Sequence, residues 1–288
     1  MTFYFPLPAR GVSMAFLPGN RDMGLFQRIS SLFSGLTAST YPWPALDVTL
    51  PGKRHLHLVG SIHMGTRDMA PLSERLIGKL RAADALIVEA DVSSGGSPFS
   101  NIEPEISLEQ RLEPETYQQV VTLCDELGLS LSSIENQPAW QVALIMQAHQ
   151  AQRLGLRPDY GIDYQLLEVA QRFGVPVTEL EGAQSQIDLL TALPNGGMSL
   201  LNDTLTHWHT NARLLQIMIG WWLETPPQQG NIALPNTFGD ELYNVLMHQR
   251  NHQWRDFLQQ LPAGRYVVAV GALHLYGEGN LPELLKKG

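Results

Sequence analysis

Two histidines and one glutamate stand directly after strand-like runs of the sequence. His63 and His274 each lie three residues after a glycine, Gly60 or Gly271, that ends an apolar run, and Glu89 closes a third such run. Two neutral imidazoles and one carboxylate form a ligand set that leaves one position of a divalent ion open for water. The bound ion makes that water a nucleophile near neutral pH. These residue types therefore predict a hydrolytic metal site.

The first histidine and the glutamate belong to one strand, helix, strand pattern. A short apolar run, Leu56–Val59, ends at Gly60. Pro71 is placed to open a helix over Leu72–Ala83, and Leu86–Val88 follows as a β-prone run. A crossover of this length makes the two strands parallel, and we expect them to be neighbours. Both polar residues then leave the carboxyl edge of the sheet, where open α/β sheets bind ligands.

Two later segments return to the same sheet. The amphipathic stretch Asp240–Leu261 predicts a helix before the strand Tyr266–Val270, which carries the second histidine. Tyr164–Phe173 predicts a helix as well. Val175–Glu181 predicts a strand that starts late or lies near an edge, because Pro176 has no backbone N–H. The predicted fold class is α/β, with a mixed, largely parallel sheet built from βαβ-type units and with helical insertions.

Helical patterns interrupt the sheet pattern in two regions. Leu108–Leu127 and Ala139–Leu154 carry apolar residues at helical spacing, and the helical pattern returns from 183 to 223. A layer of helices over the carboxyl edge of the sheet is a place where substrate specificity can vary. We therefore expect these insertions to form the substrate groove. Trp221 or Trp222 should then face that groove.

These patterns together predict the domain organisation. We expect residues 41–288 to form a single α/β domain, with helical insertions at about 103–158 and 183–225. Residues 1–40 are rich in Phe, Pro, Gly and Ser and lack a secretory pattern. We interpret them as an N-terminal extension that is either disordered or an artefact of the chosen start codon.

The composition is that of a globular protein with one large core. The chain has 288 residues, 44% hydrophobic and 16% charged, with a formal net charge of −9. Phosphate binding needs clustered Lys and Arg, and no such cluster occurs, so we expect no nucleic-acid partner. The apolar stretch 217–223 is too short to span a bilayer, and we expect no transmembrane segment and a cytoplasmic location. Cys124, the single cysteine, is expected to be a buried hydrophobe on a helix.

Six short blocks run in order along the chain and include the residues described above. They are Gly60-Ser61-Ile62-His63, Val88-Glu89-Ala90-Asp91, Gly161-Ile162-Asp163, Leu180-Glu181-Gly182, Arg250-Asn251 and Ala269-Val270-Gly271-Ala272-Leu273-His274-Leu275. In these blocks the chain resembles the TraB/GumN family, whose animal relatives are the Tiki proteases, and most closely a branch found in enterobacteria. More distant kin include erythromycin-esterase-like and ChaN-like proteins. This chain has Trp254 where many members have methionine, which we expect to alter packing only.

The resemblance implies a metal-dependent, peptidase-like hydrolase that acts on peptide bonds, and its substrate would be a peptide or a small molecule. His63, Glu89 and His274 would be its metal ligands and catalytic centre, and the divalent ion would be zinc, manganese or cobalt. Arg250 would polarise the scissile carbonyl or hold a carboxylate, because its guanidinium is an always-charged fork.

Four further residues are candidates for the surroundings of this centre. Asp163 and Asn251 have short polar side chains suited to orienting an imidazole or the arginine, and the alternative is that they cap a turn or helix. Glu179 and Glu181 face the same side of a regular strand, so either could line the site.

Other functions remain open at the level of the sequence. The erythromycin-esterase kin suggest a metal-independent, esterase-like hydrolase in which Glu89 is the base rather than a ligand. The histidines could instead cap strand ends as scaffold. The family also suggests a non-catalytic protein that binds or sequesters a peptide or haem, although no extra axial ligand for haem is evident. The oligomeric state leaves no local residue pattern.

Overall fold

The computed structural model describes residues 40–91, 103–227 and 232–287. The predicted N-terminal extension, apart from its last residue, lies outside these ranges. Residues Ser39–Gly288 form one compact unit. Within the described ranges, every helix is too short or too polar to cross a membrane.

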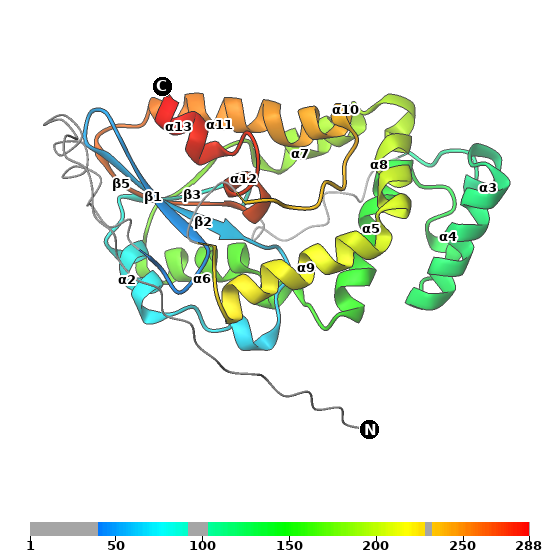
Figure 1. The fold of residues 1–288 in the computed structure, drawn as a ribbon, viewed down its shortest axis with the longest axis horizontal. Coiled ribbons are helices and arrows are strands. Elements are labelled where there is room, and N and C mark those ends of the chain that lie inside the picture. The colour runs from blue at the N-terminus through cyan, green and yellow to red at the C-terminus, as the bar shows by residue number, and fades with distance from the viewer. Residues whose placement is uncertain (1–39, 92–102, 228–231, 288) are drawn as a thin grey trace, which may run out of the picture. The chain divides into compact units, whose positions relative to one another are not determined.

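A five-stranded sheet forms the centre of this unit, with strand order β1-β2-β5-β3-β4 (Figure 1). The strands are β1 (Ala45–Leu50), β2 (Arg54–Ser61), β3 (Ala85–Val88), β4 (Val177–Glu179) and β5 (Gly264–Gly271). β1 runs antiparallel to β2, and the other neighbouring pairs are parallel. The predicted mixed, largely parallel α/β sheet is therefore confirmed.

The strands that precede His63 and Glu89 are not neighbours, so that prediction is wrong. β5 lies between them, and its Val268 is paired with Leu58 of β2 on one side and with Ile87 of β3 on the other. β5 is the natural central strand because its apolar residues are buried on both faces of the sheet. A hydrophobic pattern reports burial but not the order in which strands pair.

Helices cover both faces of the sheet (Figure 1). On one face lie α2 (Glu74–Arg81) and α6 (Ile162–Phe173), and on the other lie α11 (Arg250–Gln259) and α13 (Leu281–Lys287). Leu76 and Leu80, one turn apart on α2, are fully buried against the sheet core. Trp254 and Leu258, one turn apart on α11, are buried in the same way. Gly174, in the left-handed conformation, ends α6.

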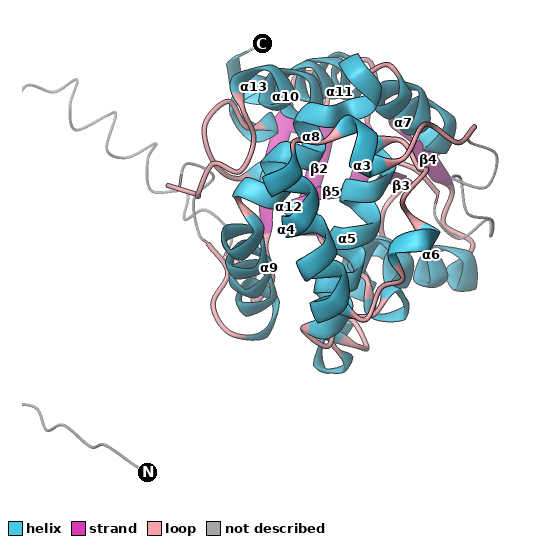
Figure 2. Ribbon diagram, turned by 90° about the vertical axis from the view of Figure 1, so that its right-hand side faces the viewer, coloured by secondary structure: helices cyan, strands magenta, loops and turns pink. Residues whose placement is uncertain are grey.

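A second group of helices packs around its own hydrophobic cluster, which includes the buried Cys124, Trp140 and Met146. These inserted helices are α3 (Leu108–Arg111), α4 (Pro114–Leu127), α5 (Ala139–Arg153), α7 (Gly182–Thr191), α8 (Pro194–Thr206) and α9 (Trp208–Leu223). α9 joins this cluster through Trp208 only, and its Leu214, Met218 and Trp221 belong to the sheet core. The inserted helices fall within the two segments predicted as helical insertions. Seen from the side on which α4, α5 and α8 lie, these helices stand in front of the strands (Figure 2).

Several predicted boundaries shift for local reasons. The helix predicted over 108–127 is broken before Pro114, which is the first residue of α4 and cannot continue a helix that precedes it. The helix predicted from Leu72 begins at Glu74, because the Ser73 side chain accepts the Leu76 N–H and caps it. The strand predicted over 175–181 is only β4, at the sheet edge, as Pro176 indicated.

The helix predicted over 240–261 is confirmed as a continuous helical stretch of three parts. It consists of α10 (Asp240–Tyr243), the π-helix η5 (Asn244–Gln249) and α11. π-Helical turns are rare and frequently lie at functional sites. Arg250, the first residue of α11, directly follows this wide turn. Shorter elements are η1 (Arg67–Met69), η3 (Leu131–Ser133), η4 (Pro158–Tyr160) and α12 (Ala272–Leu275).

Candidate functional site

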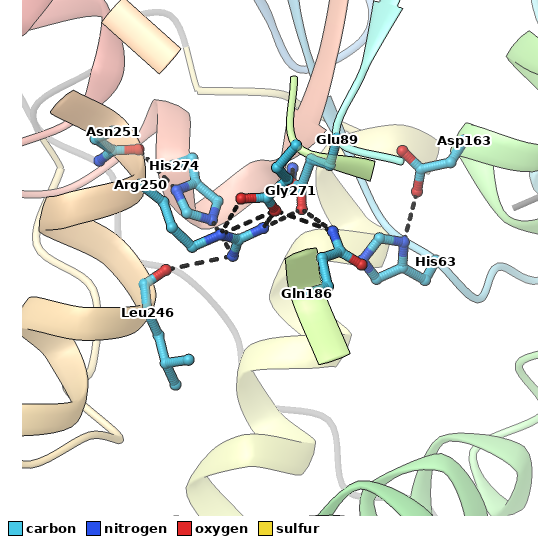
Figure 3. Close-up of polar contacts among 10 residues, drawn as sticks. His63, Glu89, Asp163, Gln186, Leu246, Arg250, Asn251, Gly271 and His274 are labelled. Carbon is cyan, nitrogen blue, oxygen red and sulfur yellow. Dashed lines mark hydrogen bonds and ion pairs between the residues drawn. The ribbon is translucent and has the colours of Figure 1, made fainter. Parts of the chain in front are cut away.

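The carboxyl ends of the four parallel strands bring the predicted polar residues to one edge of the sheet (Figure 3). His63 follows β2, Glu89 follows β3, Glu181 follows β4, and His274 lies in α12 after β5. His63, Glu89 and His274 line one cavity together with Arg250. The sequence thus identified the residues that gather at this edge.

Arg250 lies at the centre of these side chains, and its hydrogen bonds use every guanidinium N–H. Its Nε donates to the two carboxylate oxygens of Glu181 at 3.1 and 3.2 Å. Its Nη2 donates to Oε2 of Glu89 at 2.6 Å and also to Glu181. Its Nη1 donates at 3.3 Å to the carbonyl of Leu246 in η5 and to Nε2 of His274. As placed, Arg250 holds two carboxylates and has no unused N–H for a substrate carbonyl.

Both oxygens of Glu89 are occupied. Oε1 accepts the backbone N–H of Gly271 at 2.6 Å, and Oε2 accepts from Arg250. Burial by itself would raise the pKa of this carboxyl, but the charge of Arg250, with His274 and His63, lowers the pKa to about 2. Glu89 is therefore an ionised carboxylate at neutral pH and a weak base.

His274 is buried and held in one tautomer. Its Nε2 faces Arg250, which can only donate, so Nε2 accepts and the proton lies on Nδ1. Nδ1 then donates to Oδ1 of Asn251 at 2.7 Å, the contact expected of a residue that orients an imidazole. Burial lowers the pKa of His274 to about 3, with help from the charges of Arg250 and His63 and against the opposing charge of Glu89. The ring of Trp254 packs 4.4 Å from the imidazole and 4.6 Å from the Arg250 guanidinium.

His63 lies in a different environment from His274. Its Nδ1 lies 2.9 Å from Oδ2 of the buried Asp163 (Figure 3), and the negative charge of Asp163 raises the pKa of His63 to about 9. The His63 side chain is 65% accessible because it lines the cavity. Among the described residues, none bonds its Nε2.

A glycine allows Asp163 to approach His63. A Cβ added to Gly161 would lie 2.3 Å from the backbone oxygen of His63, so no other residue fits there without a shift of the backbone. The N–H of Ile162 donates to the carbonyl of Ile62 at 2.9 Å and ties the start of α6 to the end of β2. The block Gly161-Ile162-Asp163 therefore places a carboxylate beside the imidazole.

Orientation and contacts give different answers on whether these residues fit a metal ion. Each imidazole has Nδ1 against an oxygen, of Asp163 or Asn251, which is the usual orientation of a histidine ligand. Arg250, itself a cation, already binds Glu89 and the Nε2 of His274. In the described part of the chain, no three His, Cys, Asp or Glu side chains lie where they could hold a metal ion. As placed, the side chains do not fit the ion, and the divalent metal stays a prediction.

Sequence reasoning missed one residue of this centre and left a choice between two others. Gln186, in α7, donates to Glu181 at 3.0 Å and lies 3.5 Å from Oε2 of Glu89. It belongs to no motif, and no signal in the sequence marks it. Of the two strand-end acids, Glu181 joins the centre, whereas Glu179 accepts the backbone N–H of Asp91 at 2.6 Å.

The cavity beside these residues has a volume of about 460 Å³. Its walls include residues of α5, α8 and α9, as expected for a groove formed by the inserted helices. The tryptophans predicted to face it do not line it. Trp221 packs against Tyr276 with ring centroids 5.1 Å apart, and Nε1 of Trp222 donates to the carbonyl of Gly60 at 3.0 Å. The face of α9 that lines the cavity carries Leu214 and Met218 instead.

The fold and the site define the class of this protein. It is an α/β protein whose sheet edge carries two Gly-x-x-His histidines and a glutamate, beside an arginine from α11. Residues 46–288 match the TraB/PrgY/gumN family, and the chain belongs to that family. It is 59% identical over 264 residues to the uncharacterized protein YbaP of Escherichia coli strain K12 and to that of Shigella flexneri. Each alignment covers 92% of this chain and 100% of the relative. No solved structure matches the chain.

Proposed function

We propose that this protein is a hydrolase in which His63 is the base that activates water. The observation that carries this proposal is an imidazole whose Nδ1 lies 2.9 Å from the buried carboxylate of Asp163, while Nε2 has no partner among the described residues. Histidine bases in hydrolases are oriented by a carboxylate in this way. Glu89 is a poorer candidate for the base because its pKa is near 2 and both its oxygens are engaged.

In the proposed reaction, His63 acts in its neutral form, which predominates above its pKa of about 9. Its Nε2 takes a proton from water as the water oxygen forms a bond to the carbonyl carbon of an ester or amide. The negative charges of Asp163 and Glu89 stabilise the imidazolium that forms. The bond from the carbonyl carbon to the leaving group then breaks, and Nε2 returns the proton to that group. Arg250 positions Glu89 and His274. This is the metal-independent, esterase-like form of the reaction.

Hydrolysis of p-nitrophenyl acetate by untagged protein and by two histidine variants tests the role of His63. His63→Gln keeps a polar side chain but removes the base, and we expect turnover to fall by about 10²-fold or more. His252→Gln, which changes an exposed histidine on α11 outside the cavity, should leave turnover unchanged. A His63→Gln protein as active as the wild type would rule out His63 as the base.

Dialysis against a chelator tests the metal-independent form separately. We expect turnover to survive this treatment. If it is lost and then restored by zinc, manganese or cobalt, the metal-dependent hydrolase implied by the family resemblance is correct instead. Wild-type protein that cleaves neither esters nor amides would favour the non-catalytic binder of a peptide or haem.

A further inference from the structure

The cavity beside His63 is polar at one end only. Its polar end is the sheet edge with Glu89, Arg250 and His274, and the remaining walls are largely apolar. These walls include residues of α5, α7, α8, α9, η5 and the segment before α10. The apolar side chains include Leu144, Ala148, Leu200, Leu214, Met218 and Phe238.

Two glutamine side chains within the apolar walls donate to the protein itself, although Oε1 of Gln150 is buried without a partner among the described residues. Nε2 of Gln147 donates to Oγ1 of Thr204 at 2.7 Å, and Nε2 of Gln150 donates to the carbonyl of Trp208 at 2.9 Å. Among the described lining residues, acidic and basic side chains occur only at the polar end. A charged group deep in the cavity would lose its hydration without gaining an oppositely charged partner among the described residues.

We propose that this cavity binds the aliphatic acyl chain of a neutral ester or amide and places the carbonyl of that substrate beside His63. The inference deepens the proposed function, on which it rests, by naming the substrate class. A volume of about 460 Å³ lies within the range of roughly 300–1,000 Å³ that small-molecule sites occupy. The apolar walls begin next to the polar centre, so a chain and a carbonyl joined by one bond can reach both.

The same walls disfavour an extended peptide as the substrate. Peptides that bind in extended form usually pair their backbone with the exposed edge of a sheet. The two edge strands here are β1 and β4, and no described residue of either strand lines the cavity. The walls are helical, and helices use their backbone N–H and C=O groups internally.

Binding of primary alkyl amides from acetamide to decanamide, measured by titration calorimetry, tests the inference without requiring turnover. Each methylene that leaves water should tighten binding about four-fold until the chain fills the cavity. The kcat/KM for p-nitrophenyl esters should rise by a similar factor per methylene from acetyl to octanoyl.

Three variants check that the increase in affinity and in kcat/KM with chain length comes from this cavity. Ala148→Phe places a ring inside the cavity, and we expect affinity and kcat/KM to stop rising with chain length. Leu215→Ala enlarges the cavity and should shift the preferred chain to a greater length. Gln152→Phe adds the same ring on the exposed side of α5 and should behave as the wild type. If Ala148→Phe does not fold, the wild-type series and Leu215→Ala still decide the question.

The outcomes separate this inference from the proposed function. An affinity that does not change with chain length overturns the inference, as does a hydrophobic peptide that binds more tightly than any alkyl amide. Chain-length-dependent binding without ester turnover supports the acyl cavity and refutes the hydrolase. Turnover that is indifferent to chain length supports the hydrolase and refutes the acyl cavity.

Discussion

Replacing Gly161 with alanine should separate Asp163 from His63 through a backbone clash alone. The Gly161 backbone angles, φ −59° and ψ 140°, are open to any residue, so the substitution introduces no conformational strain of its own. The added Cβ would lie 2.3 Å from the oxygen and 2.8 Å from the carbon of the His63 carbonyl, and 2.9 Å from the Pro158 oxygen. All three atoms belong to the backbone, so a segment of chain must move.

The expected loss of stability follows from this clash. Overpacking of a well-packed interior costs about 1–3 kcal/mol. At about 2–4 °C per kcal/mol for a chain of this size, the melting temperature of Gly161→Ala should fall by roughly 2–12 °C. The separation of Asp163 should also lower the pKa of His63 from about 9, because the charge of Asp163 is the main cause of the shift.

Gly78→Ala is the matched control. Gly78 lies inside α2, and a Cβ there would meet nothing within 4 Å. Alanine in a helix interior is more stable than glycine by roughly 0.5–1 kcal/mol, so this variant should melt higher than the wild type. Thermal unfolding followed by circular dichroism gives the melting temperatures, and an NMR titration of the histidine Cε1–H gives the pKa. If Gly161→Ala melts at the wild-type temperature with the pKa of His63 unchanged, the close approach described here is wrong.

Three further substitutions give distinct expected results. Asp163→Asn removes the main charge that raises the pKa of His63 to about 9, so that pKa should fall toward 6.5 by NMR. A base works when neutral, so the rising limb of the pH–rate profile should move to lower pH, and an unmoved limb would contradict the assignment. Glu89→Gln removes a negative charge that stabilises the imidazolium of His63, so it should keep the fold by circular dichroism but lower turnover, whereas a fully active variant would refute any catalytic role. Asn251→Leu leaves the buried Nδ1–H of His274 unpaired, so the free energy of unfolding measured in urea should fall by about 1–3 kcal/mol. An unchanged free energy of unfolding would mean that this hydrogen bond is absent.

The sequence by itself determined that His63, Glu89 and His274 reach the candidate site. The direction of a strand and the place where it ends are local properties, carried by apolar runs and by the glycines that close them. Gly60 and Gly271 mark two such ends, and the histidines that follow them lie at the carboxyl edge of the sheet. Glu89 was found in the same way. Composition and pattern were also sufficient for the α/β class.

Only the tertiary structure decided how these residues contact one another. The central place of β5 depends on pairing between strands far apart in the sequence, which no local pattern specifies. The contacts of Arg250 with Glu89 and Glu181, and of Gln186 with Glu181, join segments from different elements. Charge states followed from these contacts, since burial and neighbouring charges, which exist only in the folded chain, shift the pKa of a side chain. Residues of the same type, His63 and His274, acquire opposite pKa shifts for that physical reason.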